Sequence, residues 1–263
     1  MRIIVSVKAV PVPGSVEVDP ETHTLKRSSA ELILNPPDRA AIEMALRLKA
    51  SYGAEVVVIS MGPPNVIPIL KRIYAQGADK IILLSDRAFA GSDTLATSYV
   101  LSRAIEKIFD YNLVLMGLHS IDGETGQVPA ETAAILGLPS LTNVKQMWKE
   151  GDSWIALREH EYGEEEVEVE IPAVISVNDE AFDYFTPPSL KRLLKAEEID
   201  PEIWTASDLQ IAPERLGLEG SPTKVLDVYQ KVLDTKGKII EGDPSLLAEE
   251  IYKVLKEKGI VKN

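Results

Sequence analysis

Apolar runs and helix-like segments alternate through residues 2–136, and this alternation constrains the fold more than any other feature of the sequence. A short apolar run bounded by turn residues is typical of a buried strand, and helical patterns between such runs indicate βαβ units. The order therefore predicts an α/β protein in which helices cover both faces of a parallel sheet. We expect strands at residues 2–8, 54–61, 80–84 and 113–116, and helices at 35–53, 65–76, 92–109 and 130–136.

Capping residues mark the ends of these helices. Gly53, Gly77 and Gly137 follow three of them, at positions where glycine commonly ends a helix. Asn35 precedes two prolines, and Ser92 precedes the third helix. Both are residue types that cap helix starts, and proline is tolerated in a first turn, so we expect Asn35 and Ser92 to be N-caps.

Beyond residue 140 the pattern changes to longer strands. We expect them at 142–148, 153–162 and 165–177, joined by turns at 150–152 and 162–164. Such turns predict hairpins and hence an antiparallel extension of the sheet. In the last strand, apolar residues alternate with glutamates, which is typical of a strand with one wet face.

The two ends of the sequence are less regular. A turn is expected at 19–22, and a loop at 179–188 with three aromatic residues leads into an amphipathic stretch at 189–198. Residues 200–242 have weak periodicity and are expected to lie on another part of the molecule. A last helix at 243–259 carries an apolar stripe, which must bury either on its own sheet or on a partner subunit.

Two strand-to-helix junctions are candidate anion sites. In the stretch 113–134, the apolar run breaks at Gly117 and a polar turn leads into a helix. Such loops lie at the carboxyl edge of a parallel sheet, where helix starts offer free N–H groups to phosphate. At 89–98, Thr94, Thr97 and Ser98 adjoin a second helix start, with Asp93 in a capping or ribose role. Spacing alone equally allows ordinary turn chemistry, because neither GxGxxG nor GxxxxGK[ST] occurs.

Composition excludes several classes of function. The net charge of −13 argues against a general nucleic-acid or anionic-membrane surface, although Lys191, Arg192 and Lys195 leave a local basic patch open. The absence of cysteine excludes disulfides, thiolate metal sites and a cysteine nucleophile. No apolar run approaches a membrane span, and the chain begins with a strand-like run, so we expect a soluble cytoplasmic protein without membrane insertion.

Side-chain catalysis has no convincing candidates either. The three histidines, His23, His119 and His160, have no metal-ligand spacing, and there is no GxSxG sequence. Asp122 and Glu124 are either a carboxylate pair or caps of the following helix. We therefore expect no catalytic residues and no metal, and favour a protein that holds a nucleotide or redox cofactor.

Seven segments together resemble one known family. They are VKAVP (7–11), NPPD (35–38), VVVISMGPP (56–64), QGADKIILLSDRAFAGSDTLATS (76–98), IDGETGQV (121–128), EVEIPAVISV (168–177) and GSPTKV (220–225). Over nearly its full length the chain resembles the β subunit of electron transfer flavoproteins. The resemblance implies a Rossmann-like subunit that pairs with an α subunit carrying FAD and exchanges electrons with a partner dehydrogenase or quinone-reducing oxidoreductase.

The resemblance also implies an adenine nucleotide in the β subunit. In one branch of the family this is structural AMP; in the electron-bifurcating branch it is a second FAD, which takes a hydride from NADH. The segments DTLATS (93–98) and IIEGDP (239–244) look like the bifurcating branch, so FAD is favoured and AMP is the alternative.

The site residues follow from the same resemblance. Ala9 and Asn35 are expected beside the adenosine, with Ser60, Met61 and Gly62 lining the cleft. The remaining cofactor-binding residues are expected to be Gly117, Asp122, Gly126, Gln127 and Val128 near the ribose and phosphates, and Thr94, Thr97 and Ser98 at a flavin-side phosphate.

Partner contacts and domains are expected as follows. Residues 1–198 form the Rossmann-like domain, with a partner-recognition loop at about 178–198 in which Leu190 binds the dehydrogenase. Residues 199–263 form a C-terminal arm on the α subunit. Relatives usually carry Lys or Arg and then Gln just before an Ala-Ile-Asp motif. Here those two positions are His119 and Ser120, preceded by Leu118, so the electrostatic role of that cation requires a protonated His119.

Two other classes remain as alternatives. A universal-stress-type adenine nucleotide-binding module should have a glycine-rich phosphate loop in its last βα turn, and does not need residues 140–263. An ATP-using amide- or adenylate-forming enzyme should carry an SGGxDS-type loop after its first strand, where this chain has the proline-rich residues 10–14.

Overall fold

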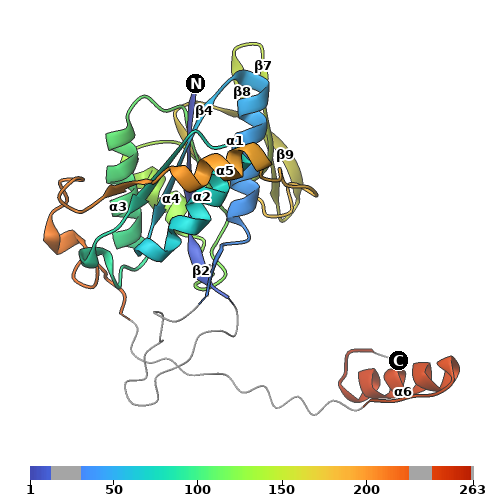
Figure 1. Ribbon diagram of the computed structural model, residues 1–263. Helices are drawn as coiled ribbons and strands as arrows, with labels where there is room; N and C mark the ends of the chain where they lie inside the picture. The colour runs from blue at the N-terminus through green and yellow to red at the C-terminus, as the bar shows by residue number, and fades with distance from the viewer. Residues whose placement is uncertain (13–30, 225–238, 262–263) are drawn as a thin grey trace. The chain divides into compact units, whose positions relative to one another are not determined.

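The structure is a computed structural model that describes residues 1–12, 31–224 and 239–261; the turn expected at 19–22 lies outside the described residues. The chain divides into two compact units, Met1–Val228 and Tyr229–Asn263, and each is described by itself. The first unit is built on a nine-stranded sheet with helices on both faces (Figure 1). The expected α/β, Rossmann-like class is therefore confirmed.

Seven strands of this sheet are parallel, in the order β11-β5-β4-β1-β6-β10-β7, and β8 and β9 continue it antiparallel. A separate antiparallel pair, β2 and β3, follows the first strand. The four strands expected before residue 117 are confirmed as β1, β4, β5 and β6. The bounds are β1 Arg2–Val7, β2 Ala9–Pro11, β3 Leu32–Leu34, β4 Glu55–Met61, β5 Lys80–Leu84, β6 Leu113–Gly117, β7 Ser140–Glu150, β8 Ser153–His160, β9 Gly163–Val169, β10 Ala173–Val177 and β11 Glu202–Trp204.

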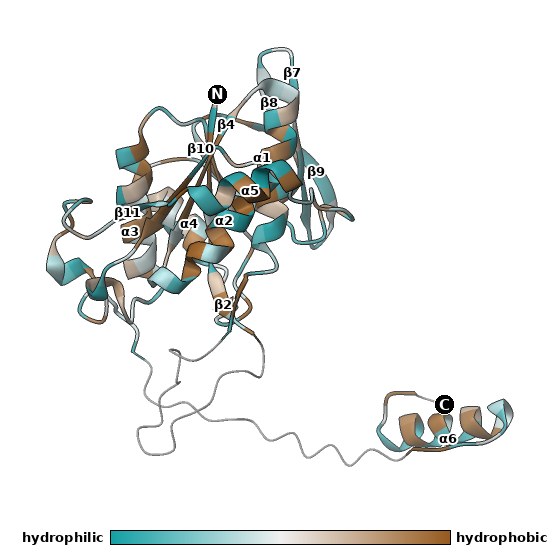
Figure 2. Ribbon diagram, viewed as in Figure 1, coloured by the Kyte–Doolittle hydropathy of each residue, from teal (hydrophilic) through white to brown (hydrophobic). Residues whose placement is uncertain are grey.

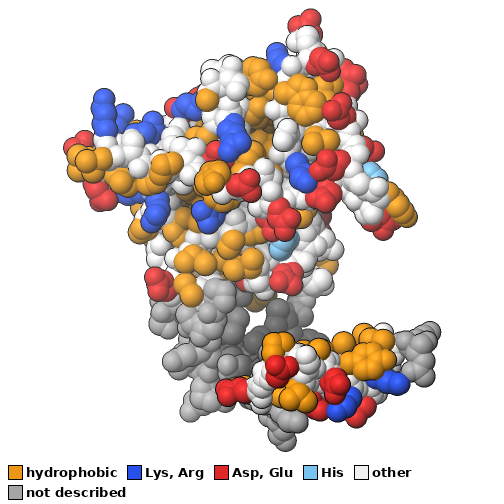
Figure 3. Space-filling model, turned by 90° about the vertical axis from the view of Figure 1, so that its right-hand side faces the viewer, with side chains coloured by type: hydrophobic (Ala, Val, Ile, Leu, Met, Phe, Trp, Pro, Cys, Tyr) orange, Lys and Arg blue, Asp and Glu red, His pale blue; other side chains and the backbone are white. Residues whose placement is uncertain are grey.

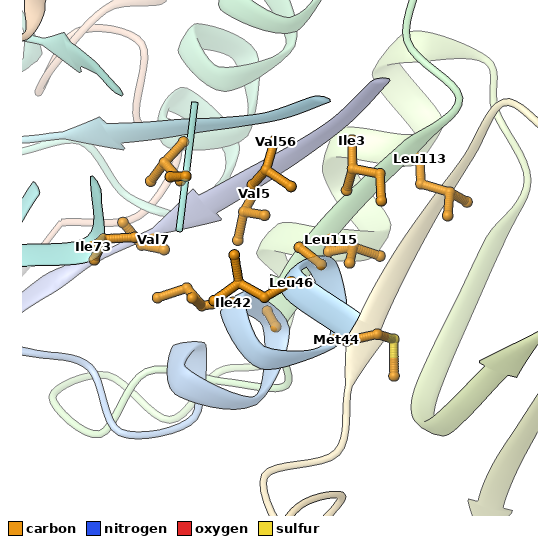
Figure 4. Close-up of a cluster of buried hydrophobic side chains, with 14 of the residues drawn as sticks. Ile3, Val5, Val7, Ile42, Met44, Leu46, Val56, Ile73, Leu113 and Leu115 are labelled. Carbon is orange, nitrogen blue, oxygen red and sulfur yellow. The ribbon is translucent and has the colours of Figure 1, made fainter. Parts of the chain in front are cut away.

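Alternate residues of the central strands point to opposite faces, which gives the sheet two cores. On one face Ile3, Val5 and Val7 of β1 pack against α1 (Asp38–Tyr52) and α2 (Ile67–Gln76), as Figure 4 shows for the α1 side. On the other, Ile4 packs with side chains of α3 (Thr94–Ile108) and α4 (Val128–Leu136). This confirms helices on both faces.

Two helix starts differ from expectation. The N-cap of α1 is Pro37, with no side-chain hydrogen bond, because the Asn35 side chain bonds to a more distant loop. The N-cap of α3 is Asp93, whose carboxylate accepts from Ala96 N, while the Ser92 hydroxyl donates to Phe89 O. The predictions that Asn35 and Ser92 are caps were therefore wrong.

The antiparallel extension is confirmed, but the strand expected at 165–177 is two strands. It breaks at Ile171-Pro172, since proline has no N–H for the ladder. β9 forms the sheet edge, and β10 runs back into the middle of the sheet between β6 and β7, buried along its length. Acidic side chains gather along the β9 edge (Figure 3); those of Glu164, Glu166 and Glu168 are exposed.

The segment after β10 packs on the same unit. α5 (Leu190–Glu198) begins at Ser189, whose hydroxyl accepts from Arg192 N, and packs against α2. β11 then pairs with β5, and apolar side chains beyond it, including Leu209 and Leu216, enter the second core. The first compact unit thus continues beyond the domain boundary expected at 198.

The last described helix, α6 (Pro244–Glu257), begins at Asp243, which accepts from Ser245 N. It confirms the helix expected at 243–259. Apolar segments recur along it (Figure 2), and Leu246, Ile251 and Val254 are exposed. Its packing on a partner stays a prediction. Among the described residues, no helix combines the length and apolar character needed to cross a membrane.

Candidate functional site

The strand order places a topological switch point between β1 and β6, and the region outside the carboxyl ends of these two strands is called the crevice below. These strands are neighbours, but the chain leaves β1 for α1 on one face and leaves β6 for α4 on the other. Ligands of open α/β sheets bind at such a reversal point, outside the carboxyl ends of the strands. The loop between β6 and α4, residues 118–127, is called the 118–127 loop below.

Asn35 connects the two sides of this crevice. Its side chain is buried and donates from Nδ2 to His119 O at 2.9 Å and to Asp38 Oδ1 at 2.9 Å. Its Oδ1 accepts from Ile121 N at 3.1 Å. One buried amide therefore fixes the 118–127 loop to the start of α1.

Asp38 completes this network. Its Oδ2 accepts from Lys8 N at 2.6 Å, and the backbone N–H of Gly117 also donates to its carboxyl group. Burial raises the pKa of Asp38 to about 7, against the opposing effect of these hydrogen bonds and of the Lys8 charge. β1, β6 and α1 thus meet at one buried carboxyl group.

The raised pKa predicts a pH dependence of stability. Unfolded Asp38 loses its proton near pH 4, whereas folded Asp38 retains it to about pH 7. Between these values the unfolded state binds fewer protons, so stability falls as pH rises, by at most about 1.4 kcal/mol per pH unit from this group. Wild type should therefore lose its stability advantage over Asp38→Asn as pH rises from 4.5 to 7 in urea unfolding. An advantage that grows with pH would show that Asp38 is held as a carboxylate.

Lys8 and Asp122 form an ion pair across the mouth of the crevice. Lys8 Nζ lies 2.6 Å from Asp122 Oδ1, and Ser120 Oγ donates to the same carboxylate at 2.7 Å. Partial burial raises the pKa of Asp122, but Lys8 and Ser120 outweigh it, so the net pKa is below its ordinary value. Asp122 is therefore ionised. Neither Asp122 nor Glu124 caps α4, because the N-cap of this helix is Gln127.

The start of α4 is open. Gln127 is its N-cap without a side-chain hydrogen bond, and the backbone N–H groups of residues 125–128 donate to no other described residue. Gly126 has a φ of 62°, which favours glycine. Gly126 and Gln127 are exposed, and Val128 is half-buried. Free N–H groups at the positive end of a helix suit an anion.

The start of α3 is closed by the chain's own carboxylate. Asp93 accepts from Ala96 N at 3.0 Å, and from Thr223 N at 3.0 Å and Thr223 Oγ1 at 2.8 Å. Burial opposes its ionisation, but these bonds outweigh burial and lower the pKa of Asp93. An ionised Asp93 repels a phosphate, so the anion-binding character lies at α4.

The hydroxyl groups of α3 point to α4. Thr94 Oγ1 donates to Glu131 Oε1 at 3.1 Å and lies 3.3 Å from Gln127 Oε1. The fully buried Ser98 donates to Glu131 Oε2 at 3.0 Å and contacts Val128 O. Thr97 is half-buried in the same helix. The structure thus brings Thr94 close to Gln127 and Ser98 close to Val128, and both hydroxyl groups also bond to the carboxylate of Glu131.

The other expected residues lie at the same edge. Ala9 pairs with Leu34, next to Asn35. Ser60 pairs with Val7 at the end of β4, followed by half-buried Met61 and Gly62. The Ser60 hydroxyl is buried and has no hydrogen-bond partner among the described residues. A buried hydroxyl without a partner is unusual and suits a site completed by a ligand.

Leu190 lies apart from this edge. It begins α5 and is 73% exposed, beside the exposed Leu194. The helix α5 packs against α2, and the role of Leu190 in partner binding stays a prediction.

Sequence reasoning missed Lys8, Asp38 and Glu131 as members of the site. Lys8 and Asp38 stand inside segments that carried the family resemblance, VKAVP and NPPD, which was the available signal. Glu131 had none, because its role depends on the packing of α3 against α4.

Comparisons with known proteins agree with this architecture. The model of the electron transfer flavoprotein domain matches residues 22–209. The electron transfer flavoprotein subunit beta of Clostridium acetobutylicum is 39% identical, covering 99% of this chain and 100% of the relative. At the same coverage, the caffeyl-CoA reductase-Etf complex subunit CarD of Acetobacterium woodii is 38% identical, and the acryloyl-CoA reductase electron transfer subunit gamma of Anaerotignum propionicum is 34% identical. The chain therefore belongs to the family of electron transfer flavoprotein β subunits.

Proposed function

We propose that this chain binds an adenine nucleotide, FAD in preference to AMP, in the crevice between β1 and β6. Paired with an FAD-carrying α subunit, it transfers electrons between NADH or a dehydrogenase and an acceptor by flavin-based bifurcation. The observation that carries the proposal is the open start of α4, whose free N–H groups directly follow the loop after β6, at the carboxyl edge of the sheet. The network of Asn35 and Asp38 holds the loop that leads to it.

The residues present fit such a nucleotide. Phosphate oxygens need N–H donors, which residues 125–128 offer. Ribose hydroxyls need acceptors, which the ionised Asp122 offers, and the buried Ser60 hydroxyl needs a partner. The flavin supplies the redox chemistry, while the protein binds and orients it and shields it from water.

The relatives support the choice of partners. CarD and the acryloyl-CoA reductase subunit are named as parts of CoA-ester reductase systems. We therefore propose that the acceptor or donor enzyme acts on a CoA ester and docks at α5, around Leu190. A quinone-reducing oxidoreductase is the other partner class that the family resemblance suggests.

The test is the nucleotide content of the heterodimer co-expressed with its α subunit. Extraction and mass identification should give two FAD per heterodimer. One FAD and one AMP would place the chain in the non-bifurcating branch and leave the crevice assignment intact. A heterodimer without a second adenine nucleotide would disprove the proposal. NADH should reduce the two-FAD form, as followed by flavin absorbance.

A further inference from the structure

The 118–127 loop contains no lysine or arginine, yet a cation lies on it. Lys8 Nζ is 2.6 Å from Asp122 Oδ1 and donates to Ser120 Oγ at 3.3 Å. Lys8 directly follows β1, more than a hundred residues away in the chain. The loop's positive charge is therefore supplied from the opposite side of the crevice.

The backbone of Lys8 is fixed while its ammonium group stays accessible. Lys8 N donates to the buried Asp38, and Lys8 O accepts from Asn35 N at 2.8 Å. The side chain is 47% exposed, and that of Asp122 is 33% exposed. An exposed ion pair contributes little to stability, so separating Lys8 from Asp122 costs little free energy.

We propose that Lys8 binds the adenine nucleotide's α-phosphate, while Asp122, its partner in the ion pair, binds the ribose hydroxyls as the family resemblance already suggests. This inference rests on the proposed function and assigns a role to Lys8 within it. Charge complementarity supports the assignment, because an ammonium group donates to phosphate oxygens and a carboxylate accepts from hydroxyl groups. The pair keeps both groups at the crevice mouth, and the free N–H groups at the start of α4 then share the phosphate with Lys8.

The alternative role for Lys8 is to brace the 118–127 loop through Asp122. The two roles predict different effects of replacing Lys8 on ligands with and without a phosphate group. A phosphate-binding lysine affects AMP and FAD but not adenosine, whereas a brace affects all three equally.

The experiment uses heterodimer stripped of its β-site nucleotide, with AMP and adenosine as calorimetric probes at two salt concentrations. Lys8→Met should weaken AMP binding about 10- to 100-fold, the loss expected for one charge-assisted hydrogen bond, and leave adenosine binding unchanged. It should also flatten the salt dependence of AMP binding. Lys8→Arg should recover most of the affinity. Unchanged adenosine binding shows at the same time that the variant is folded.

Lys80→Met is the matched control. Lys80 lies 2.7 Å from Glu202 and is 41% exposed, but it stands at the amino-terminal end of β5, away from the crevice. It should leave both ligands unaffected. Equal losses of AMP and adenosine in Lys8→Met, or no loss of either, would overturn the role of Lys8. Wild type that binds neither ligand would overturn the proposed function itself.

Discussion

Replacing Gly117 by alanine is expected to lower stability by about 3 kcal/mol and to release most of the β-site nucleotide. A Cβ at this position would lie 2.9 Å from Asp38 N and 3.0 Å from Pro37 C, and closer still to Asp38 Oδ1. The two nearest backbone atoms belong to the start of α1, so no side-chain rotation relieves the contact. Overpacking of this kind costs about 1–3 kcal/mol, and the displaced Asp38 loses hydrogen bonds as well.

Gly123→Ala is the control within the same loop. A Cβ there would meet only Ser120 Oγ, at 3.8 Å, which is an ordinary contact. This variant should stay within about 0.5 kcal/mol of wild type. The comparison needs urea unfolding of the heterodimer and the FAD or AMP content per heterodimer for both variants. Equal stability of Gly117→Ala and Gly123→Ala would contradict the proposed close approach of α1 to β6.

The parallel strands β1, β4, β5 and β6 could be predicted because they are continuous apolar runs. β1 and β6 are buried almost throughout, and few other structures fit such short runs between helices. The break at Pro172 could not be placed with the same certainty, because the alternation of β9 runs on into the apolar residues of β10. The central position of β10 depends on its parallel pairing with β6 and β7, which are distant from it in the sequence or joined to it through the β8–β9 hairpin.

The location of the site could be predicted from the sequence, but most of its hydrogen bonds could not. The strand ends and the start of α4 follow from local sequence, since a loop after a parallel strand lies at the carboxyl edge. The partners of these loops do not. Asn35 has the side chain of a helix cap, but its amide bonds to residues 119 and 121, which only the fold brings near. The contact of Lys8 with Asp122 depends on the same long-range pairing of β1 with β6.

The hydrogen bond from Thr94 to Glu131 is another contact that only the fold creates, and it has a consequence for ligand binding. A hydroxyl group has one proton to donate, and in this structure Thr94 donates it to Glu131. The same holds for the buried Ser98. Since Asp93 also closes the start of α3, the acidic groups around this helix favour ligand groups that donate hydrogen bonds over phosphate oxygens. The phosphate site we propose therefore depends on α4 and Lys8.

Asn35→Ala is expected to have the other large effect. The substitution leaves Ile121 N and His119 O without their side-chain partner and removes a donor from the carboxyl group of Asp38. A buried polar group left unsatisfied costs about 1–3 kcal/mol, so a loss of about 3 kcal/mol in the free energy of unfolding is expected. Freed from α1, the 118–127 loop should also hold the nucleotide at least about tenfold more weakly.

Hydrogen exchange gives the sharpest measurement of this effect, because the Ile121 amide is bonded to the Asn35 side chain itself. In Asn35→Ala its exchange should accelerate together with that of the rest of the 118–127 loop. Amides of the β7–β8 hairpin should accelerate only by the factor that the lower global stability of the variant explains. Asn65→Ala changes an exposed asparagine of the β4–α2 connection and should alter neither stability nor exchange. A slow-exchanging Ile121 amide in Asn35→Ala would mean that the loop is held by contacts other than this buried amide, and the account of how the crevice is kept in shape would fail.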